Sequence, residues 1–417
     1  MHHFNYRDDE MFCEDVPIAA IADAVGTPFY LYSHATLKRH FMIFNEAFSG
    51  LERTVCYSAK ANSNISILKL FADLGGGLDI VSGGELYRGL KAGVPPERIV
   101  YSGVGKRVDE IDFALDTGIL MFNVESLEEL ERIDGRAGML NKTAPVAIRV
   151  NPDVDPKTHP YISTGMKKNK FGIDTQTAIE AYQVASRLKN IDIIGVDCHI
   201  GSQITEVGPF EDALTNLKKL IGQLREMGIA IRYLDMGGGL GITYEDESPP
   251  QPDEYARAIV DALKGESVHL ILEPGRVVVG NAGALVTRVL YRKKGPDKVF
   301  LITDAGMNDL MRPMLYQAYH AVQAVDRKRA GSSILADVVG PICESSDFLA
   351  KDREVPDAKS GDLLAVMSAG AYGYTMSSNY CSRLKVPEVM ARGDQYHVIK
   401  TRQSYEDLVA GETIISL

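Results

Sequence analysis

The sequence predicts an α/β fold, a TIM-type (β/α)8 barrel together with a second, β-rich domain. Between about residues 50 and 285, short β-branched runs alternate with longer amphipathic stretches, a rhythm typical of parallel strands joined by helical crossovers. After about residue 286, strand-like stretches and Pro and Gly turns become frequent. The chain of 417 residues is also long enough for one large domain and a smaller one.

The predicted barrel strands are short runs bounded by Gly, Pro or polar residues. They comprise residues 54–57, 78–81, 99–101, 120–123, 146–149, 193–196, 231–234 and 268–271. About eight strand-helix units in this length favour a closed barrel. An open, doubly wound sheet with a similar number of strands is the alternative that the pattern alone leaves open.

Helical patterns occupy the intervals between these runs. Apolar residues at helical spacing mark residues 65–71, 127–133 and 213–224, and the first of these stretches ends at Gly75. The second begins at Ser126 with Glu129 three residues later, the spacing of a capping box. Beyond the barrel region, strand-like residues gather at 286–289 and 299–302, and residues 361–366 are predicted to form a turn leading into a strand.

Charge, cysteine content and the N-terminal sequence indicate which binding partners and which cellular compartment are to be expected. The formal net charge of -11 argues against nucleic acid and anionic membranes, because both select basic patches. The five cysteines form no CxxC pair and no metal-type cluster, so we expect reduced thiols and no bound metal. The first residues lack the basic and apolar regions of a signal peptide, and no apolar run is long enough to span a bilayer. We therefore expect a cytoplasmic protein.

Polar residues and glycines recur where the predicted strands end, which in a barrel of this type is the face that carries the active site. These residues are Lys60, Asp79, Arg149, His199, Ser202, Gly238, Gly239, Glu273, Gly275 and Arg276. Each has a simpler reading when taken singly, such as a solvated charge, a packed histidine or a glycine turn. The glycine run does not fit a dinucleotide fingerprint, because the third position after Gly239 is Ile242. Their joint position at one face nevertheless indicates a catalytic site.

The residue types at this face are those that pyridoxal phosphate requires. A lysine forms a Schiff base with the cofactor, glycine amides hold its phosphate, and an acid partners its pyridine nitrogen. Lys60 is the candidate for the first role and Glu273 for the last.

These motifs resemble those of the barrel-fold pyridoxal-phosphate decarboxylases, the family of the diaminopimelate, ornithine and biosynthetic arginine decarboxylases. The resemblance runs from residue 26 to residue 380. Residues 57–62 resemble the Schiff-base lysine segment, and residues 199–203 resemble the segment whose histidine stacks on the cofactor ring and whose serine contacts the phosphate. Residues 237–239 and 273–276 resemble the phosphate-binding segments, whose glutamate also faces the ring nitrogen.

The resemblance implies pyridoxal 5'-phosphate as cofactor and an alanine-racemase-like fold in which the first strand of the chain joins the C-terminal part. The barrel is therefore expected at residues 35–285 and the β-rich domain at residues 1–34 and 286–417. The cofactor-binding residues implied are Lys60, Asp79, Arg149, His199, Ser202, Gly238, Gly239, Glu273, Gly275, Arg276 and Tyr372.

Within the family, residues 307–316, 340–347 and 370–373 resemble motifs of diaminopimelate decarboxylases. The resemblance implies that Cys343 is the catalytic proton donor beside Lys60. The implied substrate-binding residues are Arg276, Arg312, Tyr316, Glu344 and Tyr372. One departure is Cys381, a position where asparagine is more usual in the family.

The chemistry of the substrate favours the same assignment. Diaminopimelate carries a second carboxylate and a second ammonium at its far end. Arg276 and Arg312 suit the carboxylate, and Glu344 suits the ammonium. A diamine-forming enzyme would leave the arginines without a partner, although Arg312 could also be a surface or interface ion pair. The expected reaction is decarboxylation at the D centre of meso-2,6-diaminopimelate to L-lysine and CO2, the last step of lysine biosynthesis.

The resemblance also implies a homodimer in which each barrel receives the cysteine segment of its partner. Other readings remain open. A related decarboxylase could act on ornithine, lysine, arginine or carboxynorspermidine. An amino-acid racemase would share the barrel and the lysine but lack residues 343–345. A non-catalytic regulatory relative would lack Lys60 or Cys343, and both are present.

Overall fold

The computed structural model describes residues 2–154 and 170–415, and the chain divides into two compact units. The barrel unit comprises His40–Thr243 and Glu247–Val278. The β unit comprises Met1–Arg39, Tyr244–Asp246 and Val279–Leu417.

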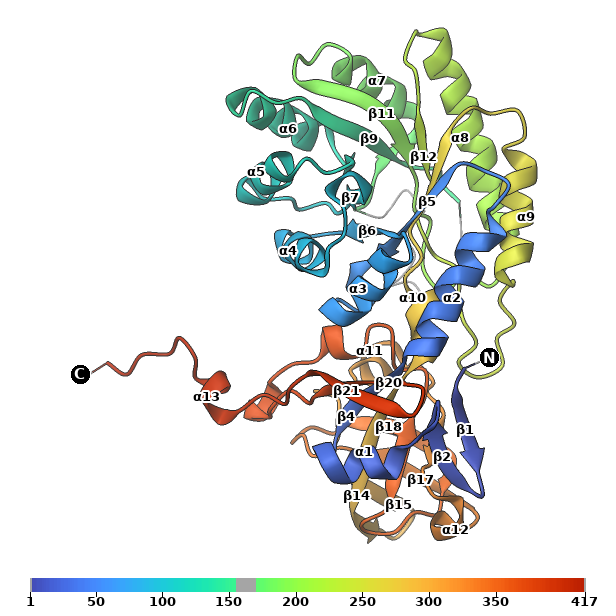
Figure 1. Cartoon of the computed structure of the whole chain (residues 1–417), viewed down its shortest axis with the longest axis vertical. Helices are drawn as coiled ribbons and strands as arrows, with labels where there is room; N and C mark the ends of the chain where they lie inside the picture. Colours follow the sequence, from blue (N-terminus) through green and yellow to red (C-terminus); the bar gives the residue numbers. More distant parts are fainter. Residues whose placement is uncertain (1, 155–169, 416–417) are drawn as a thin grey trace. The chain divides into compact units, whose positions relative to one another are not determined.

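Eight parallel strands of the described residues form a closed ring in the barrel unit (Figure 1). Their order around the ring is β5 (Arg53–Ser58), β6 (Gly77–Ile80), β7 (Ile99–Tyr101), β8 (Met121–Val124), β9 (Ala144–Asn151), β11 (Ile191–Asp197), β12 (Tyr233–Asp235) and β13 (His269–Leu272). The ring closes because β13 pairs with β5, and the short β10 (Ile173–Asp174) pairs with β9 outside it. The predicted barrel is confirmed, and the open sheet is excluded.

Helices cover the outside of this ring, as Figure 1 shows for α3 to α9. They are α2 (His34–Ala47), α3 (Ile65–Asp73), α4 (Gly83–Ala92), α5 (Val108–Thr117), α6 (Leu127–Met139), α7 (Thr175–Ala185), α8 (Gly208–Glu226) and α9 (Pro252–Ala262). The apolar stripe predicted in residues 213–224 is the buried face of α8. Inside the ring, apolar side chains of the strands, including Val100, Met121 and Ile271, form a packed core.

The start of α6 follows the predicted cap only in part. Ser126 Oγ accepts a hydrogen bond from the backbone N–H of Glu129 at 3.2 Å, which satisfies one of the free donors at the helix start. The Glu129 carboxylate does not return this bond to Ser126. It accepts instead from the backbone N–H of Glu125 at 2.9 Å and pairs with Lys106 Nζ at 2.6 Å.

A mainly antiparallel sheet is the centre of the β unit. Its strand order is β18 (Phe348–Pro356), β17 (Ser333–Val339), β15 (Val299–Thr303), β14 (Gly283–Lys294), β4 (Phe29–Ser33), β20 (Glu388–Arg392) and β21 (Gln395–Lys400). The N-terminal strand β4 lies between β14 and β20, so the start of the chain joins its C-terminal part as expected. The predicted strand after Gly361 is β19 (Leu363–Val366), which pairs with β14 and with β16 (Val322–Ala324).

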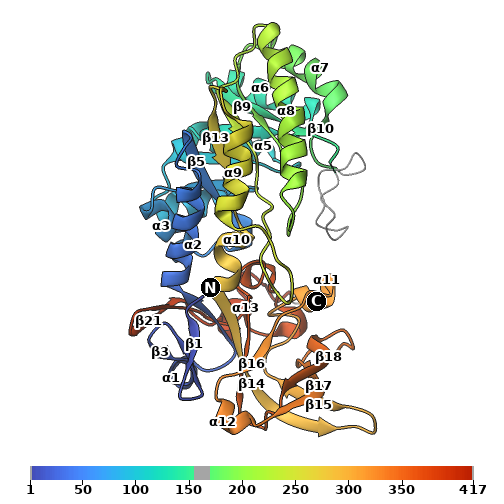
Figure 2. The ribbon, with the colours of Figure 1, turned by 90° about the vertical axis from the view of Figure 1, so that its right-hand side faces the viewer.

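The remaining elements of the β unit pack around this sheet. A small sheet of β1 (Phe4–Arg7), β2 (Glu10–Cys13) and β3 (Val16–Pro17) precedes α1 (Ile18–Val25). Figure 2 shows these N-terminal elements in dark blue among the orange and red strands of the same unit. The short α-helices of this unit are α11 (Arg312–Tyr316), α12 (Arg327–Ala330) and α13 (Tyr405–Leu408), and α10 (Arg276–Val279) follows β13 at the end of the barrel unit. In the described part of the chain, no helix is both long and apolar enough for a membrane span.

Candidate active site

Lys60 and Asp79 form an ion pair at the carboxyl ends of β5 and β6. Lys60 lies in the short 3-10 helix after β5, and its Nζ contacts Asp79 Oδ2. Ser58 Oγ donates a hydrogen bond to the same Asp79 oxygen at 2.7 Å. The Asp79 side chain is fully buried, and a buried carboxylate needs such partners because it has lost its hydration. Its other oxygen, Oδ1, is buried without a hydrogen-bond partner among the described residues.

The glycine run after β12 is required by the close approach of neighbouring loops. A Cβ atom on Gly238 would lie 2.2 Å from the Glu273 carbonyl oxygen, and one on Gly239 would lie 2.6 Å from that of Gly201. Gly239 also has a φ of +118°, which favours glycine. The backbone N–H of Gly238 donates to His199 Nδ1 at 3.1 Å. The loops after β11, β12 and β13 therefore pack backbone to backbone, and they fix the orientation of His199.

Two further residues join the same group of loops. Arg276 begins α10, is buried, and donates from Nη2 to Ser202 Oγ at 3.0 Å. Gly275 precedes it and is also buried. A guanidinium and a hydroxyl held together in this way can both donate to an anionic group.

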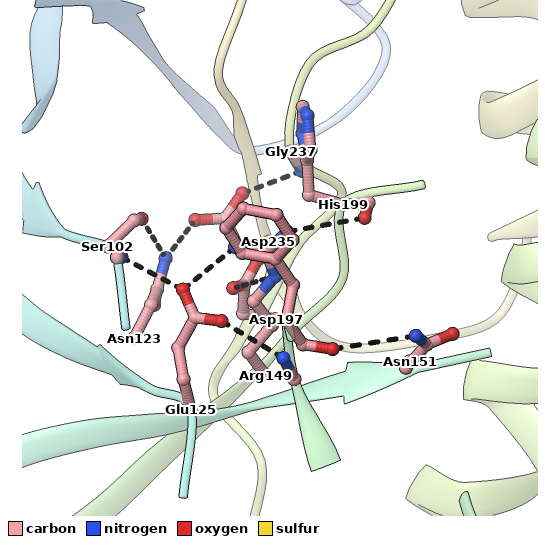
Figure 3. Close-up of polar contacts among 12 residues, drawn as sticks. Ser102, Asn123, Glu125, Arg149, Asn151, Asp197, His199, Asp235 and Gly237 are labelled. Atoms are coloured by element: carbon pink, nitrogen blue, oxygen red, sulfur yellow. Dashed lines mark hydrogen bonds and ion pairs between the residues drawn. The ribbon is translucent and has the colours of Figure 1, made fainter. Parts of the chain in front are cut away.

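Arg149, at the end of β9, anchors a second network (Figure 3). Its Nη1 lies 2.9 Å from Glu125 Oε1, and its Nη2 donates to the His199 carbonyl oxygen at 3.4 Å. Glu125 in turn accepts from the backbone N–H groups of Gly103 and Gly172 at 2.9 and 3.0 Å. Burial, followed by the nearby charges of Arg149 and Lys60, holds the pKa of His199 well below its usual value. The imidazole is therefore neutral at physiological pH.

Glu273 lies among other acids at the ends of the strands. Its Oε1 accepts from Ser102 Oγ and Asn123 Nδ2, both at 3.3 Å. Burial raises the pKa of Glu273 well above its usual range, and the charges of Asp235, Asp79 and Asp197 act in the same direction. A carboxyl group in such surroundings holds a proton at a pH where an exposed glutamate would have lost it.

In the β unit, Arg312 is 6% exposed and is held by two aromatic side chains. Its Nη1 lies 2.9 Å from His320 Nε2, and its guanidinium lies 4.7 Å from the centre of the Tyr244 ring. His320 Nδ1 lies 2.8 Å from the Met367 carbonyl oxygen, so Nδ1 carries the proton and Nε2 accepts from Arg312. This burial excludes the alternative in which Arg312 is a surface residue.

Cys343 and Glu344 are exposed in the loop between β17 and β18. Glu344 accepts hydrogen bonds from Ser346 Oγ and, at 2.9 Å, from the Tyr380 hydroxyl. These two bonds, that of Ser346 first, lower the pKa of Glu344, which keeps it anionic. The carboxylate of Asp347 fixes the loop by accepting from the backbone N–H of Ile342 at 2.6 Å.

The structure gathers the predicted residues into two groups. Ten lie at the carboxyl ends of the barrel strands: Lys60, Asp79, Arg149, His199, Ser202, Gly238, Gly239, Glu273, Gly275 and Arg276. Five lie in the β unit: Arg312, Tyr316, Cys343, Glu344 and Tyr372. Tyr316 is the last residue of α11, and Tyr372 has a φ of +53°; both are partly exposed.

Sequence reasoning missed several polar residues that touch the first group. They are Ser58, Ser102, Asn123, Glu125, Asp197 and Asp235. All six end a predicted strand or follow one within a few residues, so the criterion that selected Lys60 and Glu273 would also have selected them. In the β unit, His320 and Tyr244 were missed, and no local sequence signal links either of them to Arg312.

Comparison with known proteins identifies the family. A sequence model of the pyridoxal-dependent decarboxylases, pyridoxal binding domain, matches residues 34–280. The chain is 52% identical over 415 residues to the diaminopimelate decarboxylase of Pseudomonas aeruginosa, with 100% of both chains covered. The chain belongs to the diaminopimelate decarboxylase family.

Solved structures of this family agree. The Helicobacter pylori diaminopimelate decarboxylase complexed with L-lysine is 44% identical, with a TM-score of 0.91 over 94% of this chain and 98% of that one. The M. jannaschii enzyme in co-complex with L-lysine is 38% identical, with a TM-score of 0.94 over 100% and 99%. The resemblance found in the motifs is thus confirmed over the whole length of the chain.

The described residues of this diaminopimelate decarboxylase family member fit a pyridoxal-type cofactor. The loops around Gly238 and Gly239 leave no room for a Cβ atom, so they present bare backbone. Bare backbone amides can approach a phosphate closely. Asp79 Oδ1 and Asp197 Oδ1 are buried acceptors without hydrogen-bond partners among the described residues, one beside Lys60 and the other beside Glu273. The donor set contains the amine, the acid and the phosphate cradle that such a cofactor requires.

Proposed function

We propose that the protein decarboxylates meso-2,6-diaminopimelate to L-lysine and CO2 with pyridoxal 5'-phosphate as cofactor, the last step of lysine biosynthesis. The observation that carries the proposal is the Lys60–Asp79 ion pair at the carboxyl ends of the barrel strands, in a chain about half identical to diaminopimelate decarboxylases over its full length. The family relationship supports the substrate, and the donor set supports the cofactor.

When bound, pyridoxal 5'-phosphate supplies an electron sink for the electron pair left by departing CO2. Lys60 would hold it covalently through Nζ, and Asp79 keeps this amine in place through their ion pair. Glu273 would face the ring nitrogen and share a proton with it. The neutral imidazole of His199 would lie against the ring. Gly238, Gly239, Gly275 and Ser202 would hold the phosphate, with Arg276 orienting the Ser202 hydroxyl through their 3.0 Å hydrogen bond.

Arg149 and Tyr372 are further residues that we assign to cofactor binding. The guanidinium of Arg149 is fixed by Glu125 and by the His199 carbonyl oxygen, so it holds the histidine segment in place. Tyr372 lies in the β unit with its backbone in the left-handed region. We assign it to both the cofactor and the substrate because its segment, residues 370–373, resembles the corresponding family motif.

The far end of the substrate would be recognised by charge. Arg312 and Arg276 would bind the second carboxylate, which suits the planar fork of a guanidinium. Glu344 would bind the second ammonium, and its lowered pKa keeps it anionic for this purpose. Tyr316, at the end of α11 and on the same short helix as Arg312, would border the same group.

Cys343 would complete the reaction by protonation. The bond to the carboxylate carbon breaks, CO2 leaves, and a new C–H bond forms with the proton from the Cys343 thiol. We propose that this thiol comes from the partner subunit of a cytoplasmic homodimer, so that each site contains residues of both chains. The family resemblance of residues 340–347 supports this arrangement.

The deciding experiment is an assay of the purified protein with added pyridoxal 5'-phosphate. Meso-diaminopimelate, ornithine, lysine and arginine are offered separately, and CO2 and the amine product are both measured. We expect L-lysine from diaminopimelate and little product from the other three. A diamine formed from ornithine or lysine would overturn the assignment of the arginines and leave the cofactor site intact.

Lys60→Ala tests the cofactor half of the proposal. Without the ε-amine the cofactor cannot be held covalently, so the visible absorbance of the bound cofactor should disappear and turnover should fall by several orders of magnitude. Lys69→Ala, which removes an exposed lysine of α3, is the matched control and should change neither. Unchanged absorbance in the Lys60 variant would refute its assignment.

A further inference from the structure

His320 is a fully buried residue in the loop between α11 and β16 of the β unit. Its Nε2 lies 2.9 Å from Arg312 Nη1, and its Nδ1 lies 2.8 Å from the Met367 carbonyl oxygen. A guanidinium can only donate a hydrogen bond, and a carbonyl oxygen can only accept one. The imidazole is therefore neutral, with its proton on Nδ1 and the lone pair of Nε2 directed at Arg312.

The backbone around His320 is fixed by neighbouring strands. Arg353 of β18 donates from Nη2 to the His320 carbonyl oxygen at 3.0 Å. The carbonyl oxygen of the next residue, Ala321, accepts from the backbone N–H of Met367 at 2.8 Å. Met367 directly follows β19 and therefore binds both the backbone and the imidazole of this loop. The imidazole cannot turn away from Arg312 without losing its bond to Met367.

The Tyr244 ring holds the guanidinium from a second direction. Tyr244 belongs to the same unit and is also buried. The Arg312 guanidinium lies 4.7 Å from the centre of this ring, and the His320 ring lies 5.3 Å from it at an interplanar angle of 75°. The hydrogen bond to His320 sets the direction of Nη1, and the ring contact restricts the tilt of the guanidinium plane.

The neutrality of this partner matters for the charge of Arg312. Glu125, which holds Arg149, is a carboxylate, and its negative charge offsets that of the guanidinium. A neutral imidazole accepts a hydrogen bond without adding negative charge, and it takes only one of the five N–H donors of the guanidinium. His320 therefore orients Arg312 without weakening the attraction of Arg312 for an anion.

We propose that His320 is a positioning residue that orients the Arg312 guanidinium toward the second carboxylate of the substrate. The inference rests on the proposed function, in which Arg312 binds that carboxylate. A guanidinium binds a carboxylate best through two parallel hydrogen bonds, which require a correctly oriented plane. Orienting the plane in advance lowers the entropic cost of binding. Because the second carboxylate does not react, its contact contributes equally before and during the reaction, and its loss should raise KM more than it lowers kcat.

His320→Asn tests this inference through two ligands that differ by one carboxylate. The asparagine amide can still donate to the Met367 carbonyl oxygen, but the acceptor for Arg312 is lost. L-lysine keeps the second carboxylate of the substrate, and cadaverine is the same diamine without it. Calorimetry of the cofactor-loaded protein should show L-lysine binding weakened by about 10-fold or more and cadaverine binding unchanged. Unchanged L-lysine binding, or equal weakening of both ligands, would overturn the inference.

A second substitution at the same position and the kinetics of diaminopimelate turnover separate positioning from general damage. His320→Gln places an amide oxygen near the position of Nε2 and should restore most of the affinity for L-lysine. His320→Asn should raise KM for diaminopimelate by the same factor as for L-lysine binding, with kcat within about threefold. A fall in kcat at unchanged KM would overturn the inference. The control is His397→Asn, at an exposed position of β21, which should match the unsubstituted protein.

Nitrogen NMR of the unsubstituted protein covers the case in which the variants do not fold. At neutral pH the His320 ring, assigned by through-space contacts with the Tyr244 ring, should carry its proton on Nδ1 and none on Nε2. A proton on Nε2 would overturn the inference, because Arg312 could then not donate to it. This measurement needs no ligand. A protein that binds neither diaminopimelate nor L-lysine would overturn the proposed function, whereas a protein that binds both normally in His320→Asn would overturn only this inference.

Discussion

Two glutamates show how the surroundings of a carboxyl group determine its protonation state. Glu273 is 4% exposed, and burial together with neighbouring acids raises its pKa well above the usual range. Glu344 is exposed, and hydrogen bonds from Ser346 and Tyr380 lower its pKa. The same residue type thus provides one carboxyl group that keeps a proton and one that stays anionic. These differences match the roles proposed for Glu273 at the ring nitrogen of the cofactor and for Glu344 at the substrate ammonium.

Cys343→Ala tests the proposed proton donor. The thiol is exposed in its loop, so its loss should not disturb folding. General acids contribute roughly 10²- to 10⁴-fold to rate, and turnover of diaminopimelate should fall by about this factor while cofactor absorbance stays unchanged. Cys381→Ala removes the other exposed thiol and should leave turnover intact. A Cys343 variant with full turnover would reject the assignment.

Glu85, in the first turn of α4, should make stability depend on pH. Burial raises its pKa from 4.5 to about 7. The folded state therefore binds the Glu85 proton more tightly than the unfolded state does. The stability that the protonated Glu85 contributes is complete below pH 4.5 and is lost as the pH rises through 7. Glu85→Gln should therefore gain free energy of unfolding over the wild type between pH 5 and 8, by roughly 1–3 kcal/mol.

Urea unfolding of the cofactor-free protein at several pH values measures this difference. The amide oxygen introduced by Glu85→Gln can still accept the hydrogen bond that Glu85 accepts from the backbone N–H of Val81 at 2.7 Å. Glu128→Gln, on the exposed face of α6, should show no such trend because its side chain is 86% exposed. A difference between wild type and Glu85→Gln that is constant with pH would contradict the prediction.

At the scale of elements, the strands were predictable because their signals are local. Every predicted barrel strand overlaps an observed one, since β-branched runs bounded by Gly or polar residues are typical of buried parallel strands. The small sheet β1–β3 and the helix α1 were not predicted, because they lie outside the repeating strand-helix pattern that marked the barrel. The domain boundaries at residues 35 and 285 stay predictions.

The network around Glu273 could not be predicted, because it depends on register between strands. Asp197 and Asp235 meet only because they are partners across β11 and β12, and a shift by one residue would turn one side chain away from the barrel interior. Asn123 reaches both Asp235 and Glu273 from β8, on another part of the ring. Nothing in the sequence around Asn123, Asp235 or Glu273 specifies that their side chains lie within hydrogen-bonding distance of one another.

The loop after β12 gives a prediction about close backbone packing. A Cβ atom on Gly238 would meet the Glu273 carbonyl oxygen at 2.2 Å, which only a backbone shift can relieve. Gly238→Ala should lower the free energy of unfolding by about 1–3 kcal/mol and weaken cofactor binding. Gly222→Ala, in α8 with open space around it, should instead stabilise by about 0.5–1 kcal/mol. Urea unfolding of both variants is the measurement, and a Gly238 variant as stable as the wild type would contradict the packing argument.

At the scale of the whole molecule, the proposed chemistry is divided between the two units. Lys60 belongs to the barrel unit, and Cys343 belongs to the β unit. If each active site of a homodimer takes these residues from different chains, a variant of either residue disables both sites of its own dimer. A mixed dimer of the two variants differs, because one of its sites lacks both residues and the other has both.

Mixing the Lys60→Ala and Cys343→Ala variants tests whether each active site takes Lys60 and Cys343 from different chains. After random exchange of subunits, half of the dimers are mixed and one of their two sites is complete, so activity should recover to about a quarter of the wild-type value. Each variant alone should stay inactive, and differently tagged chains that co-purify show that exchange has taken place. If each site instead drew both residues from one chain, no mixed dimer would contain a complete site. Exchange without recovery of activity would therefore reject the shared site.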